Sequence, residues 1–114
     1  MTWEELQGYI KGKLFLIGLT FVDKNGDLKE QYQTHGNVIE LTNDGLFKLK
    51  RDDNSIFQMP YDKETIRKAE KGKYRERSTG QIIKDPDFIM TWEITISDNY
   101  DINEIKKVGF IPTD

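Results

Sequence analysis

The chain of 114 residues contains no cysteine, one histidine and three prolines. The absence of cysteine excludes a disulfide framework, a thiol nucleophile and thiolate metal ligands. No apolar run approaches the roughly 18 to 20 residues that span a bilayer. The first residues lack the basic start and apolar stretch of a signal peptide. We therefore expect a cytoplasmic protein that does not enter a membrane.

The length of the chain leaves room for one folding unit, and we expect a single domain over residues 1–114. Aromatic residues make up 11% of the sequence, which is too many for a disordered segment even though 32% of the residues are charged. The chain should therefore fold around one apolar core.

Charge is distributed unevenly along the sequence. The net charge of −3 argues against a dedicated nucleic-acid binder, because Lys and Arg supply most non-specific affinity for phosphates. Residues 63–84 nevertheless hold eight lysines and arginines against three glutamates, and both flanking segments are acidic. This basic segment is either a solvated face that pairs with the acidic C-terminal third or a site for an anion or an acidic partner.

Two long strands follow a short helix in the expected order of elements. Residues 2–5 form a capping box that starts a helix over residues 3–10. The apolar run 14–22 predicts a central strand, and Asn25-Gly26 predicts a tight turn into an antiparallel strand over 28–41. Gly36 interrupts that second strand, which is typical of a bulge or a bend.

The rest of the chain predicts shorter elements separated by turns. Asp62 is placed to cap one or two helical turns over 62–69, and Asp101 to cap a C-terminal helix that ends at Gly109. Residues 88–97 alternate strictly between apolar and other side chains, as in a half-buried strand. The other expected strands cover residues 46–50, 56–59, 73–77 and 81–84.

These elements predict a mainly β fold, either a small antiparallel barrel or a strongly bent sheet of five to seven strands with short N- and C-terminal helices. The order of elements, with a long bent strand through residues 35–38 and a helical turn after Met59-Pro60, resembles SH3-like and Sm-like small barrels. Residues 16–20 (LIGLT) and 74–80 (YRERSTG) resemble stretches of uncharacterised small bacterial proteins. The resemblance is architectural and implies no activity. The glycine-asparagine motif of the Sm RNA pocket is absent.

Catalytic and cofactor motifs are missing. His35 is the only imidazole, and no Gly-x-Ser-x-Gly elbow brings Ser55, Ser78 or Ser97 to it. The acidic loop 23–34 lacks the glycine and the bidentate glutamate of an EF-hand, so we expect no metal there. Neither a phosphate-binding loop nor a dinucleotide fingerprint is present, and we expect no cofactor.

The strongest candidate surface is a basic row in residues 73–77. If this segment is a strand, Lys73, Arg75 and Arg77 face one way while Tyr74 and Glu76 face the other. The three cations would then hold a phosphate, a carboxylate or an acidic protein edge. The alternative is that they neutralise carboxylates within the fold, with Glu40, Asp85 and Asp87 as the candidates.

We therefore expect a non-enzymatic protein-interaction module that binds through a strand edge, the basic row or exposed aromatics including Tyr61. Its size and charge are those of immunity, inhibitor or regulator proteins. The candidate binding residues are Lys73, Tyr74, Arg75, Arg77, His35 and Tyr32. The alternative is an oligonucleotide-binding barrel in which the basic segment 63–84 contacts phosphates and tyrosines stack on bases. A third possibility is an enzyme or ligand carrier with a pocket near His35.

Overall fold

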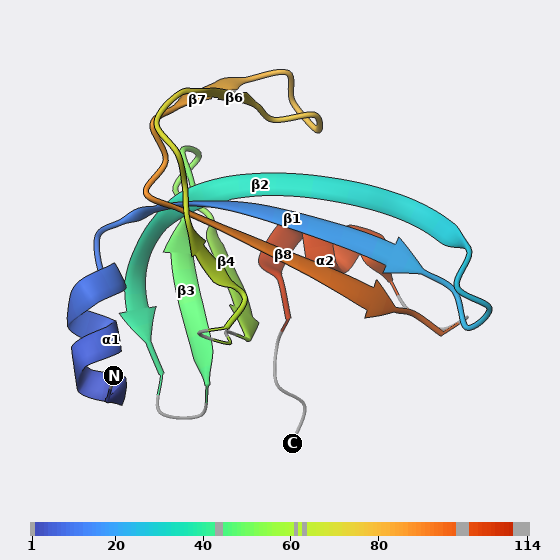
Figure 1. Ribbon diagram of the computed structural model, residues 1–114. Coiled ribbons are helices and arrows are strands. Elements are labelled where there is room, and N and C mark those ends of the chain that lie inside the picture. Colours follow the sequence, from blue (N-terminus) through green and yellow to red (C-terminus); the bar gives the residue numbers. More distant parts are fainter. Residues whose placement is uncertain (1, 43–44, 61, 63, 98–100, 111–114) are drawn as a thin grey trace.

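The computed structural model describes residues 2–42, 45–60, 62, 64–97 and 101–110, and Tyr61 lies outside them. Within these ranges the chain forms eight strands and two short helices (Figure 1). The expectation of a mainly β fold with a helix near each end is confirmed; one sheet has six strands, within the expected five to seven, and the other two strands form a separate sheet. The elements are α1 (Trp3–Ile10), β1 (Leu14–Val22), β2 (Leu28–Leu41), β3 (Leu46–Lys50), β4 (Ile56–Pro60), β5 (Ile66–Lys68), β6 (Lys73–Arg75), β7 (Ile82–Lys84), β8 (Phe88–Thr95) and α2 (Ile102–Val108).

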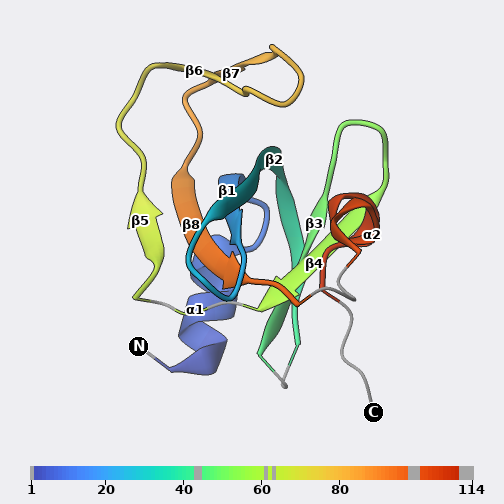
Figure 2. The same ribbon diagram turned by 90° about the vertical axis from the view of Figure 1, so that its right-hand side faces the viewer.

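Six strands form one bent sheet in the order β4-β3-β2-β1-β8-β5, and β6 and β7 form a separate hairpin. The sheet curves strongly, with β5 and β8 on one side and β3 and β4 on the other (Figure 2). In the described part of the chain it does not close into a barrel, because β4 and β5 remain its edges. The expectation of an antiparallel sheet is wrong for one pair, since β8 runs parallel to β1. Parallel strands need a long connection between them, and the segment from β2 to β7 provides it between β1 and β8.

Residues 66–68 are a strand, not the expected helical turns. The Asp62 side chain accepts a hydrogen bond from the amide of Glu64, and its carbonyl accepts one from Thr65, so the capping chemistry makes a single turn. Ile66 then pairs with Met90 on the free edge of β8. An unpaired strand edge offers backbone partners that a short isolated helix lacks, and this pairing prevails over local propensity.

Both terminal helices begin at the expected caps. Thr2 accepts from the amide of Glu5 and completes the capping box of α1. The Asp101 carboxylate caps α2, which ends at Gly109 with a φ of 79°. A Cβ at Gly109 would lie 1.9 Å from the carbonyl oxygen of Gln58, so only glycine permits this contact between α2 and β4.

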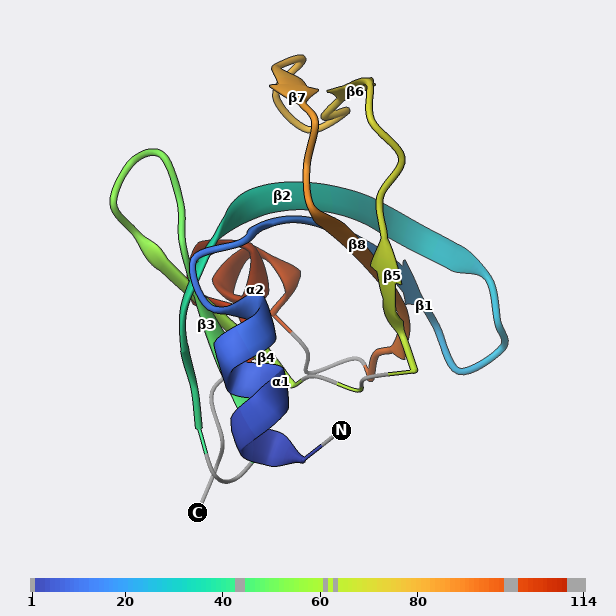
Figure 3. The ribbon, with the colours of Figure 1, turned by 60° about the vertical axis from the view of Figure 1, so that its left-hand side comes forward.

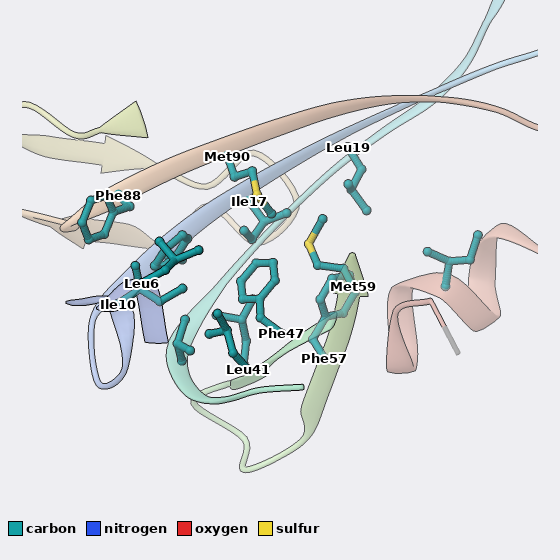
Figure 4. Packing of buried hydrophobic residues seen from close by; sticks show 14 of the residues in the cluster. Leu6, Ile10, Ile17, Leu19, Leu41, Phe47, Phe57, Met59, Phe88 and Met90 are labelled. Atoms are coloured by element: carbon teal, nitrogen blue, oxygen red, sulfur yellow. The ribbon is translucent and has the colours of Figure 1, made fainter. Parts of the chain in front are cut away.

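The core lies on the concave side of the sheet, where α1 and α2 also pack (Figure 3). Alternate β1 residues point into it, and Phe15, Ile17 and Phe21 are fully buried. Phe47 and Phe57 enter from β3 and β4 (Figure 4). The alternation predicted for 88–97 is confirmed over β8, because Phe88 and Met90 lie in this core and Trp92 and Ile94 pack against it. The intervening Thr91, Glu93 and Thr95 are exposed.

The bulge expected at Gly36 lies three residues further along β2. The extra residue in the β2–β3 pairing is Ile39, which falls between the paired residues Val38 and Glu40. At Gly36 the two backbones approach closely, and a Cβ would lie 2.7 Å from the carbonyl oxygen of Lys50. The glycine therefore permits close packing of β2 on β3 beside the bulge.

The β6–β7 hairpin stands on the convex side of the sheet, opposite α2 (Figure 1). The convex face beneath it is polar and includes Gln31, Gln33 and Thr91. Within the described ranges, no helix has both the length and the apolar character needed to traverse a bilayer. The hairpin is thus set apart from the core, and it contains most of the predicted binding residues.

Candidate functional site

The β6–β7 hairpin presents two chemically different faces. Tyr74 pairs with Ile83, and both side chains are turned inward and at least partly buried. Lys73 pairs with Lys84, and Arg75 pairs with Ile82. Directly opposed residues share a face of a hairpin, and all four of these are exposed. We call Lys73, Arg75, Ile82 and Lys84 the cationic face.

Arg77 lies beyond β6, in the turn that joins the two strands. Its side chain is exposed and lines a groove of about 380 Å³ between the turn and the convex face of the sheet. The backbone amide of Arg77 donates to Oε1 of Gln33, at 2.6 Å. The predicted alternation of exposed and buried side chains over 73–77 is therefore confirmed. Arg77 is not paired with a residue of β7, however, so it lies next to the cationic face and not within it.

The carboxylates considered as internal partners of these cations are engaged elsewhere. Glu40 pairs with Lys48 at 3.4 Å. The Asp85 side chain accepts from the amide of Gly72, and that of Asp87 accepts from the amide of Leu14. Across the residues that the structure describes, the side chains of Lys73, Arg75, Arg77 and Lys84 form no ion pair.

His35 lies on β2 beneath the turn of the hairpin, between two carboxylates. Its Nδ1 is 2.5 Å from Oε2 of Glu76, and its Nε2 is 3.1 Å from Oδ2 of Asp52. The Glu76 side chain is only 4% exposed, whereas that of Asp52 is 69% exposed. Thr79 donates to the other oxygen of Glu76, and the Gln81 amide donates to Asp52. His35 thus links β2, the β3–β4 turn and the hairpin.

The electrostatics favour a protonated imidazole. Burial lowers the pKa of His35, but hydrogen bonds and charge from Glu76 and Asp52 outweigh burial, and the pKa lies above its ordinary 6.5. Hydrogen bonds from Gln81 and His35 hold the pKa of Asp52 below its usual 3.8. The charged form of His35 donates from both ring nitrogens, one to each carboxylate.

Tyr32 belongs to a different arrangement, centred on Arg51. The Arg51 guanidinium donates to the Tyr32 hydroxyl at 3.2 Å and to the carbonyls of Lys106 and Lys107 at 2.9 and 2.5 Å. It also stacks over the ring of Phe57, 5.1 Å from the centroid. Arg51 thereby satisfies the open carbonyls at the C-terminal end of α2. Tyr32 and His35 line one cleft of about 430 Å³, away from the cationic face.

The sequence did not identify Arg51, Asp52 or Glu76 as partners of the candidate residues. Asp52 and Glu76 are 17 and 41 positions from His35, so no local spacing connects them. None of the three serines considered as nucleophiles contacts His35. Ser78 accepts from the amide of Gln33, and Ser55 bonds Arg51 and Asp53. No group of His, Asp and Glu suited to a metal ion occurs in the described ranges.

No protein-family model, no curated protein and no solved structure matches this chain. The resemblance to SH3-like and Sm-like barrels therefore stays a prediction from the order of elements.

Proposed function

We propose that this chain is a non-enzymatic protein-interaction module that binds an acidic partner protein through the cationic face of the β6–β7 hairpin. Arg77 extends that surface toward the groove beside the turn. The partner is expected to present Asp or Glu side chains around an apolar residue.

The observation that carries the proposal is the pairing of Lys73 directly with Lys84. Like charges directly opposed across two strands destabilise the pair, by roughly 0.2 to 1 kcal/mol relative to neutral residues. In the described part of the structure, no carboxylate lies within ion-pair distance of either lysine. An arrangement that costs stability and lacks an internal counter-charge is explained if the counter-charge comes from a partner.

The composition of the face favours a protein over a nucleic acid. Ile82 is 52% exposed and lies opposite Arg75, so an apolar contact sits among the cations. The only tyrosine of the hairpin, Tyr74, faces inward, and its hydroxyl donates to the carbonyl of Glu70. The phosphates of an oligonucleotide would find cations on this face, but its bases would find no ring to stack on. An acidic peptide would find cations for its carboxylates and Ile82 for an apolar side chain.

The state of His35 supports a role without catalysis. A general base needs a free ring nitrogen, and a nucleophile must lie within hydrogen-bond reach of it. Both nitrogens of His35 face carboxylates at hydrogen-bond distance. The histidine is therefore a structural group in this proposal.

Binding of a defined acidic probe tests the proposal. The probe is a fluorescent peptide of about ten residues that contains mostly glutamate and one central leucine, and anisotropy gives its affinity. The variant Lys73→Glu/Arg75→Glu/Lys84→Glu should bind at least about tenfold more weakly, since three favourable charges become repulsive. The matched control Lys11→Glu/Lys13→Glu/Lys24→Glu has the same net charge and alters exposed lysines away from the hairpin. It should bind much like the unmodified protein.

Equal affinity of the two triple variants would contradict the proposal. A single-stranded thymidine oligonucleotide of similar charge provides the second comparison. If it binds the unmodified protein more tightly than the peptide does and loses affinity in the hairpin variant, the oligonucleotide alternative replaces the protein partner. Both variants change exposed side chains, so thermal unfolding should confirm that each one folds.

A further inference from the structure

We call the six-stranded sheet with α1 and α2 the body of the protein. The β6–β7 hairpin is attached to the body mainly by polar contacts. The backbone amide of Gln33 donates to Ser78, and Gln33 in turn accepts from the amide of Arg77. Among the described residues, the other hydrogen bonds that attach it are His35–Glu76 and Gln81–Asp52. Ile83 is buried, but it lies outside the main apolar cluster. Few apolar contacts hold the hairpin, so a change in one strong polar contact shifts its docking equilibrium.

Among these contacts, only His35 changes its charge near neutral pH. The elements around its ring supply charges of both signs. Leu16, its partner on β1, is uncharged. The Arg51 guanidinium is held by the carbonyls of α2, and Lys106 pairs with Glu30. The charged groups that share the cleft with His35 are Glu76 from the hairpin, Arg51, Asp52 and Asp53 from the β3–β4 turn, and Lys106 and Lys107 from α2.

Loss of the proton from His35 weakens both of its contacts. A neutral imidazole has a single N–H, so one ring nitrogen must direct a lone pair at a carboxylate oxygen. Asp52 can turn to water, because its side chain is largely exposed. Glu76 is almost completely buried and would lose its only cationic neighbour at hydrogen-bond distance in the described structure. A buried carboxylate without a counter-charge is costly, and opening of the hairpin would hydrate it.

We propose that protonated His35 is a latch that fastens the β6–β7 hairpin to the sheet through Glu76, and that deprotonation loosens the hairpin. The latch would regulate the cationic face. This consequence for binding rests on the proposed function of that face. A fastened hairpin holds the cationic face in one orientation, and a loose one must be ordered when a partner binds. Affinity for an acidic partner should therefore fall as the pH rises.

The direction of the effect follows from the histidine alone. Because the folded protein holds the pKa of His35 above 6.5, the latch contributes its full stability below that pH. The contribution is lost as the pH rises through the pKa of the folded state. Lysine and arginine keep their charges over this range, so the cationic face itself does not titrate.

Amide hydrogen exchange measured by NMR between pH 6 and pH 9 tests the latch without any partner. After correction for intrinsic rates, protection of the hairpin amides of Glu76 and Ile83 should fall by about tenfold for each unit by which folding raises the pKa. Protection of Ile17 in β1 should stay constant. The variant Glu76→Gln removes the buried charge and should greatly reduce the pH dependence of hairpin protection, with a remainder that comes from Asp52. Should that variant fail to fold, Asp52→Asn alters an exposed group and should reduce the pH dependence.

Constant hairpin protection in the unmodified protein would overturn the latch, as would an unchanged pH dependence in Glu76→Gln. The glutamate-rich peptide separates this result from failure of the proposed function. If the peptide binds equally at pH 6 and pH 9, the latch does not regulate binding although the surface is correctly assigned. If the protection changes as expected but the peptide binds at neither pH, the proposed function is wrong and the latch remains.

Discussion

The body and the hairpin of this protein are held together in different ways. In the body, side chains such as Phe15, Phe47 and Phe57 are fully buried against one another beneath the bent sheet. In the hairpin, each strand has three residues, and a buried histidine–carboxylate contact joins it to the sheet. Apolar burial does not involve titrating groups, whereas the proposed latch makes attachment of the hairpin depend on the charge of His35.

This contrast assigns stability to the apolar residues of the body and the proposed function to the cations of the hairpin. Residues that maintain the body are apolar and enclosed, so selection for folding explains them. The cations of the hairpin are exposed, and two of them repel each other across the ladder. Changes in the body should therefore affect both regions, while changes on the cationic face should leave the body intact.

The largest effect is expected from Phe47→Ala, which opens a cavity in the core. Phe47 is fully buried and packs against Phe15, with ring centroids 5.5 Å apart. Loss of the ring should lower the free energy of unfolding by about 3 to 5 kcal/mol. Urea denaturation followed by tryptophan fluorescence measures this loss. A decrease below about 1 kcal/mol would show that the apolar cluster does not support the fold as described.

A smaller effect is expected from Arg51→Lys, which keeps the charge but removes the fork that binds two carbonyls of α2. Lysine cannot reach both acceptors in the same geometry, so stability should fall by about 1 to 2 kcal/mol. Hydrogen exchange at Gly109, whose amide closes α2, should accelerate. The control Lys50→Arg changes an exposed neighbour and should be neutral. Equal unfolding midpoints for the two variants would contradict the role of Arg51.

The smallest effect is expected from Lys84→Glu, and it has the opposite sign. The substitution replaces a like-charge pair with an opposite-charge pair beside Lys73 and should stabilise the hairpin by a few tenths of a kcal/mol. Exchange of the Tyr74 amide should slow, while affinity for the glutamate-rich peptide should fall. Lys11→Glu is the control for net charge. A destabilised hairpin would mean that the two lysines do not repel each other.

The sequence predicted the regular elements well where pattern and turn chemistry agree. Local pattern is enough to predict strands in the apolar run 14–22 and in the alternating segment 88–97. The Asn25-Gly26 pair likewise predicts the turn between β1 and β2 without reference to distant residues. Residues 62–69 were predicted wrongly because the free edge of β8 determines the structure of Ile66, and that edge is invisible locally. The parallel β1–β8 pair escaped prediction for the same reason.

The candidate site was predictable only in part. The alternation of Lys73, Tyr74 and Arg75 gives the two faces of β6, since it needs only the period of a strand. The contribution of Lys84 depends on the hairpin register, and the partners of His35 depend on how the hairpin folds over β2. Both depend on contacts between residues far apart in the sequence, so the two carboxylate partners of His35 could not be predicted from the sequence.

Native-state hydrogen exchange across a range of low urea concentrations tests most directly whether the hairpin opens independently of the body. The account predicts that amides of β6 and β7 exchange through a local opening whose free energy is lower than that of global unfolding and hardly depends on urea. Amides in the centre of β1 and β2 should exchange only through global unfolding, with the full urea dependence. If the amides of the hairpin and of β1 give the same free energy and the same urea dependence, the two regions are one cooperative unit and the account is contradicted.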